Sequence, residues 1–162
     1  MDIFIRTVCL SFAFAFLYSQ SSLFGPEYLA ANVVLLQFLN WMSYGIDGFA
    51  FASESLVGKY FGRIDRQMVN LVIKRIFFWG LGLAMLYTLI YLIAGSRIIR
   101  IFTDQPSVVL ISNQYLVWVI VMPVIAFSCY IWDGIFIGLT ASKAMRNSML
   151  LSIIMYLLIL RY

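Results

Sequence analysis

Apolar residues run along this chain in long uncharged stretches that are separated by short charged segments. Four such runs extend over residues 7–26, 28–46, 76–96 and 105–132, and a shorter fifth run covers residues 147–160. Each of the four is close to the roughly 20 residues that an α-helix needs to cross the hydrocarbon core of a bilayer. The pattern predicts an all-α, polytopic membrane protein with about five transmembrane helices.

Turn and capping residues set the expected ends of these helices. The helices are predicted at about 3–22, 28–57, 68–94, 106–132 and 147–160. A Gly-Pro pair at 25–26 separates the first two, Gly95 is expected to end the third, and Thr103 or Asp104 ahead of Pro106 is expected to cap the fourth. The first helix is too long for a signal peptide and is followed by another span. Since no Gly/Ser-rich linker divides the chain, residues 1–162 are interpreted as one membrane domain.

Composition narrows the class of function. Hydrophobic residues make up 64% of the chain and charged residues 11%, which is more apolar surface than a soluble domain of 162 residues could bury. The formal charge of +4 is spread over loops, without the basic stripe that nucleic-acid binding requires. The chain has no His, and Cys9 and Cys129 stand alone in apolar runs. We therefore expect no enzyme activity, no metal site, no cofactor and no nucleic-acid partner.

The basic residues predict how the chain is oriented. Most of them fall on one side of the predicted helices: Arg6, Lys59, Arg63, Arg66, Lys74, Arg75, Lys143 and Arg146. Glu27, Arg97, Arg100 and Asp104 fall on the opposite side, and Arg161 is expected there too. By the positive-inside rule the basic side is cytoplasmic. We expect a multi-pass protein of the inner (plasma) membrane, in contact with membrane lipids.

A polar stripe marks the second predicted helix. Asn40, Asp47 and Glu54 recur at seven-residue intervals, which is close to two helical turns, and Tyr44 borders the stripe. A carboxylate at membrane depth is costly unless a proton, a cation or water neutralises it, so such residues often mark ion pathways. The structural alternatives are that Asp47 hydrogen-bonds a neighbouring helix and that Glu54 reaches the cytoplasmic interface.

A second set of candidate functional residues lies in and just after the fourth predicted helix. Asp133 precedes Gly134 and Gly138, whose spacing permits a close helix crossing, and Pro123 lies ten residues before Asp133. Proline inside a helix removes one hydrogen bond and allows a kink that could move Asp133 relative to its neighbours. The alternative interpretation is a packing kink with an aspartate near the inner interface.

Several segments of the chain resemble the multidrug and toxic compound extrusion (MATE) transporters, and most closely their DinF-like branch. They are Leu29 to Asn32, Ser43 to Ala50, Leu56 to Gly62, Asp133 to Gly138 and Met145 to Leu150. The resemblance covers about residues 5–158 and corresponds to helices seven to eleven of the twelve-helix fold. It implies a partial second (C-terminal) lobe, so a first lobe would come from a missing segment or a partner chain.

The resemblance also implies a function. MATE transporters are cation-coupled antiporters that export drugs or organic, often cationic, compounds against proton or sodium entry. Asp133 falls on a position associated with cation coupling in related transporters, and Asp47 falls within the motif of the eighth helix. The candidate coupling or substrate residues are therefore Asp47, Asp133, Glu54, Asn40 and Tyr44.

Two other functions remain open for such a partial lobe. The chain could be a non-transporting remnant or assembly subunit that packs against another protein. It could also be a lipid-linked oligosaccharide flippase of the same superfamily, which would be expected to need cationic residues in its cavity. Lys and Arg avoid the centres of the predicted helices, and this distribution favours the drug or cation antiporter.

Overall fold

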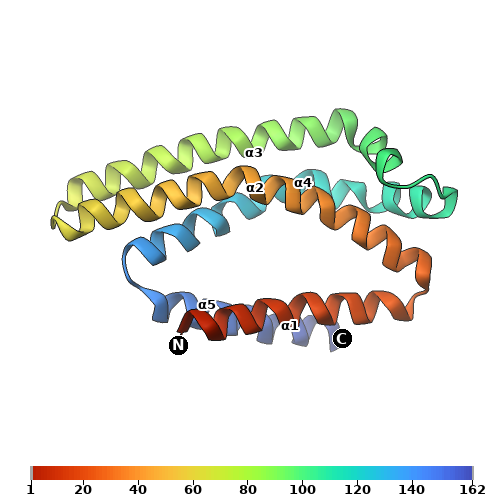
Figure 1. Cartoon of the computed structure of the whole chain (residues 1–162), viewed down its shortest axis with the longest axis horizontal. Coiled ribbons are helices and arrows are strands. Elements are labelled where there is room, and N and C mark those ends of the chain that lie inside the picture. Colours follow the sequence, from red (N-terminus) through yellow and green to blue (C-terminus); the bar gives the residue numbers. More distant parts are fainter. Residues whose placement is uncertain (1, 162) are drawn as a thin grey trace.

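The chain folds into five α-helices in the computed structural model, which describes the backbone of residues 2–161 and the side chains of residues 3–158. The helices are α1 (Asp2–Leu23), α2 (Pro26–Gly62), α3 (Arg66–Phe102), α4 (Pro106–Gly138) and α5 (Ser142–Arg161) (Figure 1). The described backbone contains no strand, and four of the helices, α1 to α4, are long and apolar enough to cross a membrane. The all-α, polytopic prediction is confirmed. The side chain of Arg161 lies outside the described residues.

Two layers of helices make up the molecule. Helices α2, α3 and α4 pack against one another, while α1 lies beside α5 as a second layer (Figure 1). Successive helices run in opposite directions because each connection is only two or three residues long. The loops 63–65 and 139–141 therefore lie at one end of the molecule with the start of α1, which we call the basic end. The loops 24–25 and 103–105 lie at the opposite end.

The hairpin of α2 and α3 is longer than a bilayer is thick. Each of the two helices has 37 residues, which corresponds to about 55 Å at a rise of about 1.5 Å per residue, against about 30 Å of hydrocarbon. The turn between them extends beyond the connection of α4 to α5 (Figure 1). Within this turn Ile64 has a φ of 59° and 85% of its surface exposed.

The buried core of the bundle has two parts. Toward the opposite end, α2, α3 and α4 contribute residues that surround the fully buried Phe38 and Tyr91. There the Tyr91 hydroxyl donates a hydrogen bond of 2.6 Å to the Phe38 carbonyl oxygen. Toward the basic end, Val57, Ile76 and Ile131 belong to a second cluster. Apolar contacts thus hold α2, α3 and α4 together along most of their shared length.

The sequence predicted that Gly95 would end the third helix, and this prediction is wrong. Helix α3 continues through Gly95 to Phe102. A Cβ atom on Gly95 would lie 3.0 Å from the Leu116 side chain of α4, so the glycine allows the two helices to approach closely. The next turn of α3 buries Ile98 and Ile99 in the core, and this burial stabilises helix beyond the glycine.

The expected cap of the fourth helix is also wrong. Gln105 is the N-cap of α4 and its side chain makes no capping hydrogen bond, while Thr103 has extended backbone and accepts the Gln105 N–H at 3.3 Å. A side-chain cap is found instead at the start of α3. There the Asp65 carboxylate accepts the backbone N–H of Met68 at 3.0 Å.

Candidate functional site

An ion pair joins the two layers near the basic end. The Arg6 guanidinium on α1 donates a hydrogen bond to the Asp133 carboxylate on α4. Both side chains are partly buried, with 25% and 37% of their surfaces exposed. It is the one ion pair among the described side chains, and it connects residues 127 positions apart in the sequence.

Asp47 on α2 lies close enough to this pair to interact with it electrostatically. Asp47 and Asp133 repel each other, and both act on the Tyr130 hydroxyl on α4. Tyr130 also lies within hydrogen-bonding reach of the Ser43 side chain on α2. Ser43 and Asp47 are four residues apart on one helix face, and Tyr130 and Asp133 are three apart on another, so the two faces oppose each other. We call these four residues, together with Arg6, the carboxylate site.

The charges of the carboxylate site do not balance. The site contains two aspartates and one arginine, so when all three are ionised it carries one excess negative charge. Asp47 makes no hydrogen bond or ion pair with a described side chain. A carboxylate in this position is stabilised by a proton or a cation. The described residues contain no group of three or more His, Cys, Asp or Glu side chains that could hold a metal ion.

Close packing of α2 on α4 sets the position of Asp133. A Cβ atom on Gly134 would collide with the Ala50 carbonyl oxygen, and one on Gly138 would lie 2.7 Å from the Glu54 carbonyl oxygen. Ser53, fully buried at the same crossing, donates a hydrogen bond of 2.7 Å to Ala50 O. The close helix crossing expected from Gly134 and Gly138 is confirmed. Because Asp133 immediately precedes this crossing, the backbone beneath it is firmly placed.

The other residues of the polar stripe do not join the carboxylate site. Asn40 donates a hydrogen bond of 3.4 Å to Gln37 on its own helix. Tyr44 has 77% of its surface exposed. Glu54 is half-buried and its carboxylate has no polar partner among the described side chains. The seven-residue repeat thus places Asn40, Asp47 and Glu54 on α2, but of these only Asp47 interacts electrostatically with Asp133.

Pro123 lies inside α4, which remains helical on both sides of it. Its side chain is buried and borders an apolar cavity of about 360 Å³ among α1, α2, α3 and α4. Around this cavity lie Leu17, Asn32, Phe38, Met42, Tyr91 and Trp118 together with neighbouring aliphatic side chains. The kink expected at Pro123 stays a prediction.

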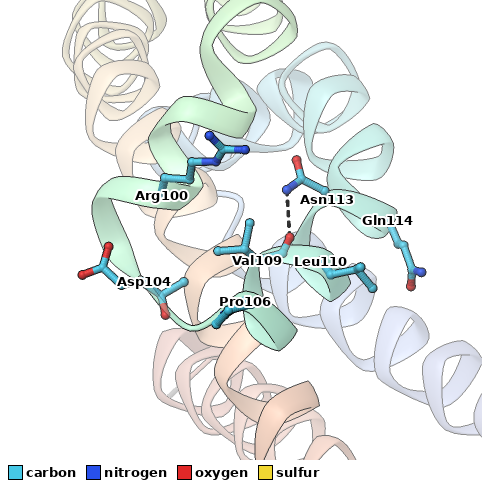
Figure 2. Close-up of a pocket in the computed structure, with 8 residues that line it drawn as sticks. Arg100, Asp104, Pro106, Val109, Leu110, Asn113 and Gln114 are labelled. Atoms are coloured by element: carbon cyan, nitrogen blue, oxygen red, sulfur yellow. Dashed lines mark hydrogen bonds between the residues drawn. The ribbon is translucent and has the colours of Figure 1, made fainter.

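A second, larger hollow of about 750 Å³ lies at the opposite end of the molecule, where α3 leads into α4 (Figure 2). Arg100, Asp104, Asn113 and Gln114 line it, and the Asn113 side chain is held by its own helix through a hydrogen bond of 2.8 Å to the Val109 carbonyl oxygen. This hollow carries charges of both signs. It is separated from the carboxylate site by most of the length of α4, and we do not assign it to that site.

Three members of the carboxylate site, Arg6, Ser43 and Tyr130, were not among the candidates from the sequence. Arg6 was interpreted only as a charge that sets orientation. One signal was available, because Arg6 lies four residues inside the first helix and Asp133 lies five residues before the end of the fourth. Opposite charges at similar depth on the same side of a membrane are candidates for a pair.

Comparison with known proteins gives two matches. The sequence profile of the MatE family matches residues 3–162. The DNA damage-inducible protein F of Escherichia coli (strain K12) is 33% identical over 148 residues, which is 91% of this chain and 32% of that protein. The chain therefore spans about a third of the length of this relative. No solved structure matches the chain significantly.

Proposed function

The chain belongs to the MatE family, and from that premise we propose that it forms part of a cation-coupled antiporter that exports drugs or organic cations. Its apolar helices make it a membrane protein, and the inner (plasma) membrane is the proposed location. The basic end, which carries Lys59, Arg63, Arg66, Lys143 and Arg146, then faces the cytoplasm and the anionic headgroups of lipids.

The pairing of Asp47 with Asp133 is the observation that supports this function best. The two carboxylates come from different helices, and the arginine pairs with Asp133, so Asp47 leaves room for one more positive charge. A proton or sodium ion and an organic cation would compete for that place. If the two forms of the site favour different arrangements of the helices, the entry of one ion drives the release of the other.

A complete transport path requires more than this chain. The matched relative is about three times as long, and the proposed twelve-helix architecture contains a second lobe that faces the first across a central cavity. We propose that a further segment or a partner chain supplies the first lobe. Exposed side chains such as Tyr44 on α2 are available to line the cavity between the lobes.

Efflux of ethidium from proteoliposomes tests the proposed coupling. The chain is reconstituted together with a first lobe, and a proton or sodium gradient is imposed. Asp47→Asn and Asp133→Asn should each lower gradient-driven efflux by at least about tenfold, because each removes a charge that the coupling cation must balance. Asp104→Asn, in an exposed loop at the opposite end, is the matched control and should leave efflux unchanged.

Other outcomes separate the alternatives. Normal efflux by both carboxylate variants would exclude their role in coupling. Absence of efflux from the unmodified protein, with correct folding, would favour a non-transporting remnant or assembly subunit. Efflux that depends on neither gradient would contradict antiport.

A further inference from the structure

Helix α1 is attached to the bundle by one polar contact near each end. At the opposite end, the Asn32 amide on α2 donates a hydrogen bond of 2.6 Å to the Ser21 hydroxyl, which is 5% exposed. At the basic end, the contact is the ion pair of Arg6 with Asp133. Along α1, an 18-residue apolar window contains no buried residue. The bundle therefore holds α1 loosely along its middle.

The two attachments differ in what can break them. The Asn32–Ser21 hydrogen bond is neutral and lies next to the turn at Gly25, whose φ of 110° is a conformation that glycine adopts without strain. The Arg6–Asp133 contact is ionic, and another cation can substitute for one partner. A cation that binds Asp133 thus removes the attachment at the basic end and leaves the other intact.

On the basis of the proposed function, we infer that Arg6 is a specificity-determining residue. Its guanidinium is a cation tethered to α1, and it binds the Asp133 carboxylate in place of a substrate cation. An organic cation reaches Asp133 only by displacing Arg6. The displaced guanidinium moves to the lipid headgroups at the basic end, because an unpaired arginine is costly within the hydrocarbon. The start of α1 separates from α4 as it does so. Arg6 thereby lowers the affinity for weakly binding cations and couples cation entry to the position of α1.

Binding of ethidium to the purified full protein tests this competition directly, through fluorescence anisotropy in detergent without any gradient. Removing the tethered cation in Arg6→Gln should lower the Kd for ethidium by about tenfold, within the range typical of coupled sites. The double variant Arg6→Gln/Asp133→Asn should lose that gain. Arg6→Lys, which keeps the charge, should resemble the unmodified protein. Arg63→Gln is the matched control, since it removes one arginine charge from the exposed turn at the basic end and should not change the Kd.

A distance measurement tests the displacement of α1. Spin labels are attached to cysteines at the exposed positions Phe4 on α1 and Ile137 on α4, in a background with Cys9 and Cys129 replaced by serine. Pulsed electron paramagnetic resonance should show a longer distance between the labels in Arg6→Gln than in the unmodified protein. Saturating ethidium should lengthen the distance in the unmodified protein in the same direction.

Failure of this inference can be told from failure of the proposed function. If Asp133→Asn weakens ethidium binding but Arg6→Gln leaves it unchanged or also weakens it, Arg6 does not compete for the carboxylate and has only a structural role. An unchanged distance between labels in Arg6→Gln likewise overturns the inference. If neither Asp47→Asn nor Asp133→Asn changes ethidium binding, the carboxylate site is not a cation site, and the proposed function and the inference are both wrong.

Discussion

Each polar side chain within the apolar bundle needs a partner, because the hydrocarbon offers none. The structure supplies such partners in two ways, although the buried hydroxyls of Thr88 and Ser112 have none among the described residues. Tyr91 donates to a backbone carbonyl on another helix, and Ser53 donates to a carbonyl on its own helix. Asp133 is paired with an arginine from a different layer. Asp47 also lacks a hydrogen-bond partner among the described side chains and has only electrostatic neighbours. For this reason the proposed cation coupling starts from Asp47.

Tyr91→Phe tests the cost of losing one buried hydrogen bond. The substitution keeps the ring that packs edge-to-face on Phe38, with centroids 5.0 Å apart, and removes the hydroxyl that donates to Phe38 O. We expect a loss of about 0.5–1.5 kcal/mol in the free energy of unfolding, measured by denaturant titration in detergent micelles. Tyr115→Phe removes a hydroxyl from an exposed side chain and should have no effect. Equal stability of the two variants would show that the buried bond contributes nothing net.

The sequence allowed single candidate site residues to be identified more readily than pairs of residues that interact. Asp47 and Asp133 stand out because charges are rare in apolar runs, and the structure brings them together. Arg6 was missed as the partner of Asp133 because the contact spans 127 residues of sequence and depends on how α1 packs. Tyr130 was missed because a tyrosine in a long apolar run gives no signal that distinguishes it from an interfacial or core aromatic residue.

At the scale of helices, the hydrophobic pattern predicts well that each helix exists and less well at which residues it begins and ends. All five helices occur where the apolar runs are, since a membrane segment must satisfy its backbone hydrogen bonds internally. The second and third helices extend further than their apolar runs, because charged residues such as Lys59 and Lys74 continue the helix outside the hydrocarbon. Gly95 misled the prediction because glycine serves both as a helix end and as a site of close packing, and only the neighbouring Leu116 distinguishes the two.

Gly134→Ala tests the crossing of α2 and α4. A methyl group at this position meets the backbone of α2, with Ala50 C at 2.8 Å, and backbone cannot yield as a flexible side chain can. We expect the free energy of unfolding to fall by about 1–3 kcal/mol, with the tryptophan fluorescence of the protein as the readout. Asp133, one residue earlier, should then be displaced, so gradient-driven efflux should fall as well.

Gly48→Ala on α2 is the matched control for that crossing. No atom lies within 4 Å of a Cβ built on Gly48, and alanine favours helix over glycine by up to about 1 kcal/mol. The variant should be as stable as the unmodified protein or slightly more so. A similar loss of stability in both glycine variants would mean that helix flexibility, and not the close crossing, is what these glycines provide.

The whole molecule is arranged in a way that the sequence did not reveal. Short loops predict neighbours that run in opposite directions, but they do not predict that α1 would leave the bundle and lie beside α5 (Figure 1). All of the helices are apolar, so hydrophobicity does not distinguish a helix that faces the bundle from one that faces lipid or another lobe. Small residues give the better guide, because Gly134 and Gly138 do lie at the tightest helix contact.

Cysteine labelling of intact cells tests the orientation of the whole chain. In a background with Cys9 and Cys129 replaced by serine, Ile64→Cys lies in the exposed loop at the basic end and Gln105→Cys lies in the loop at the opposite end. A membrane-impermeant maleimide should modify residue 105 from outside, and residue 64 only after the membrane is opened or inverted. The reverse pattern would place the basic end outside and contradict the proposed direction of export.

The α2–α3 hairpin has a practical consequence for imaging. A membrane protein enclosed in detergent offers electron microscopy little contrast when nothing projects from the micelle. Here two paired helices extend beyond the hydrocarbon and end in a tight, exposed turn at Ile64. That turn is a place to insert a rigid fusion domain or to raise an antibody fragment, which would give each particle a visible mark for alignment. The two aspartates and the arginine could then be compared in several states of the same protein.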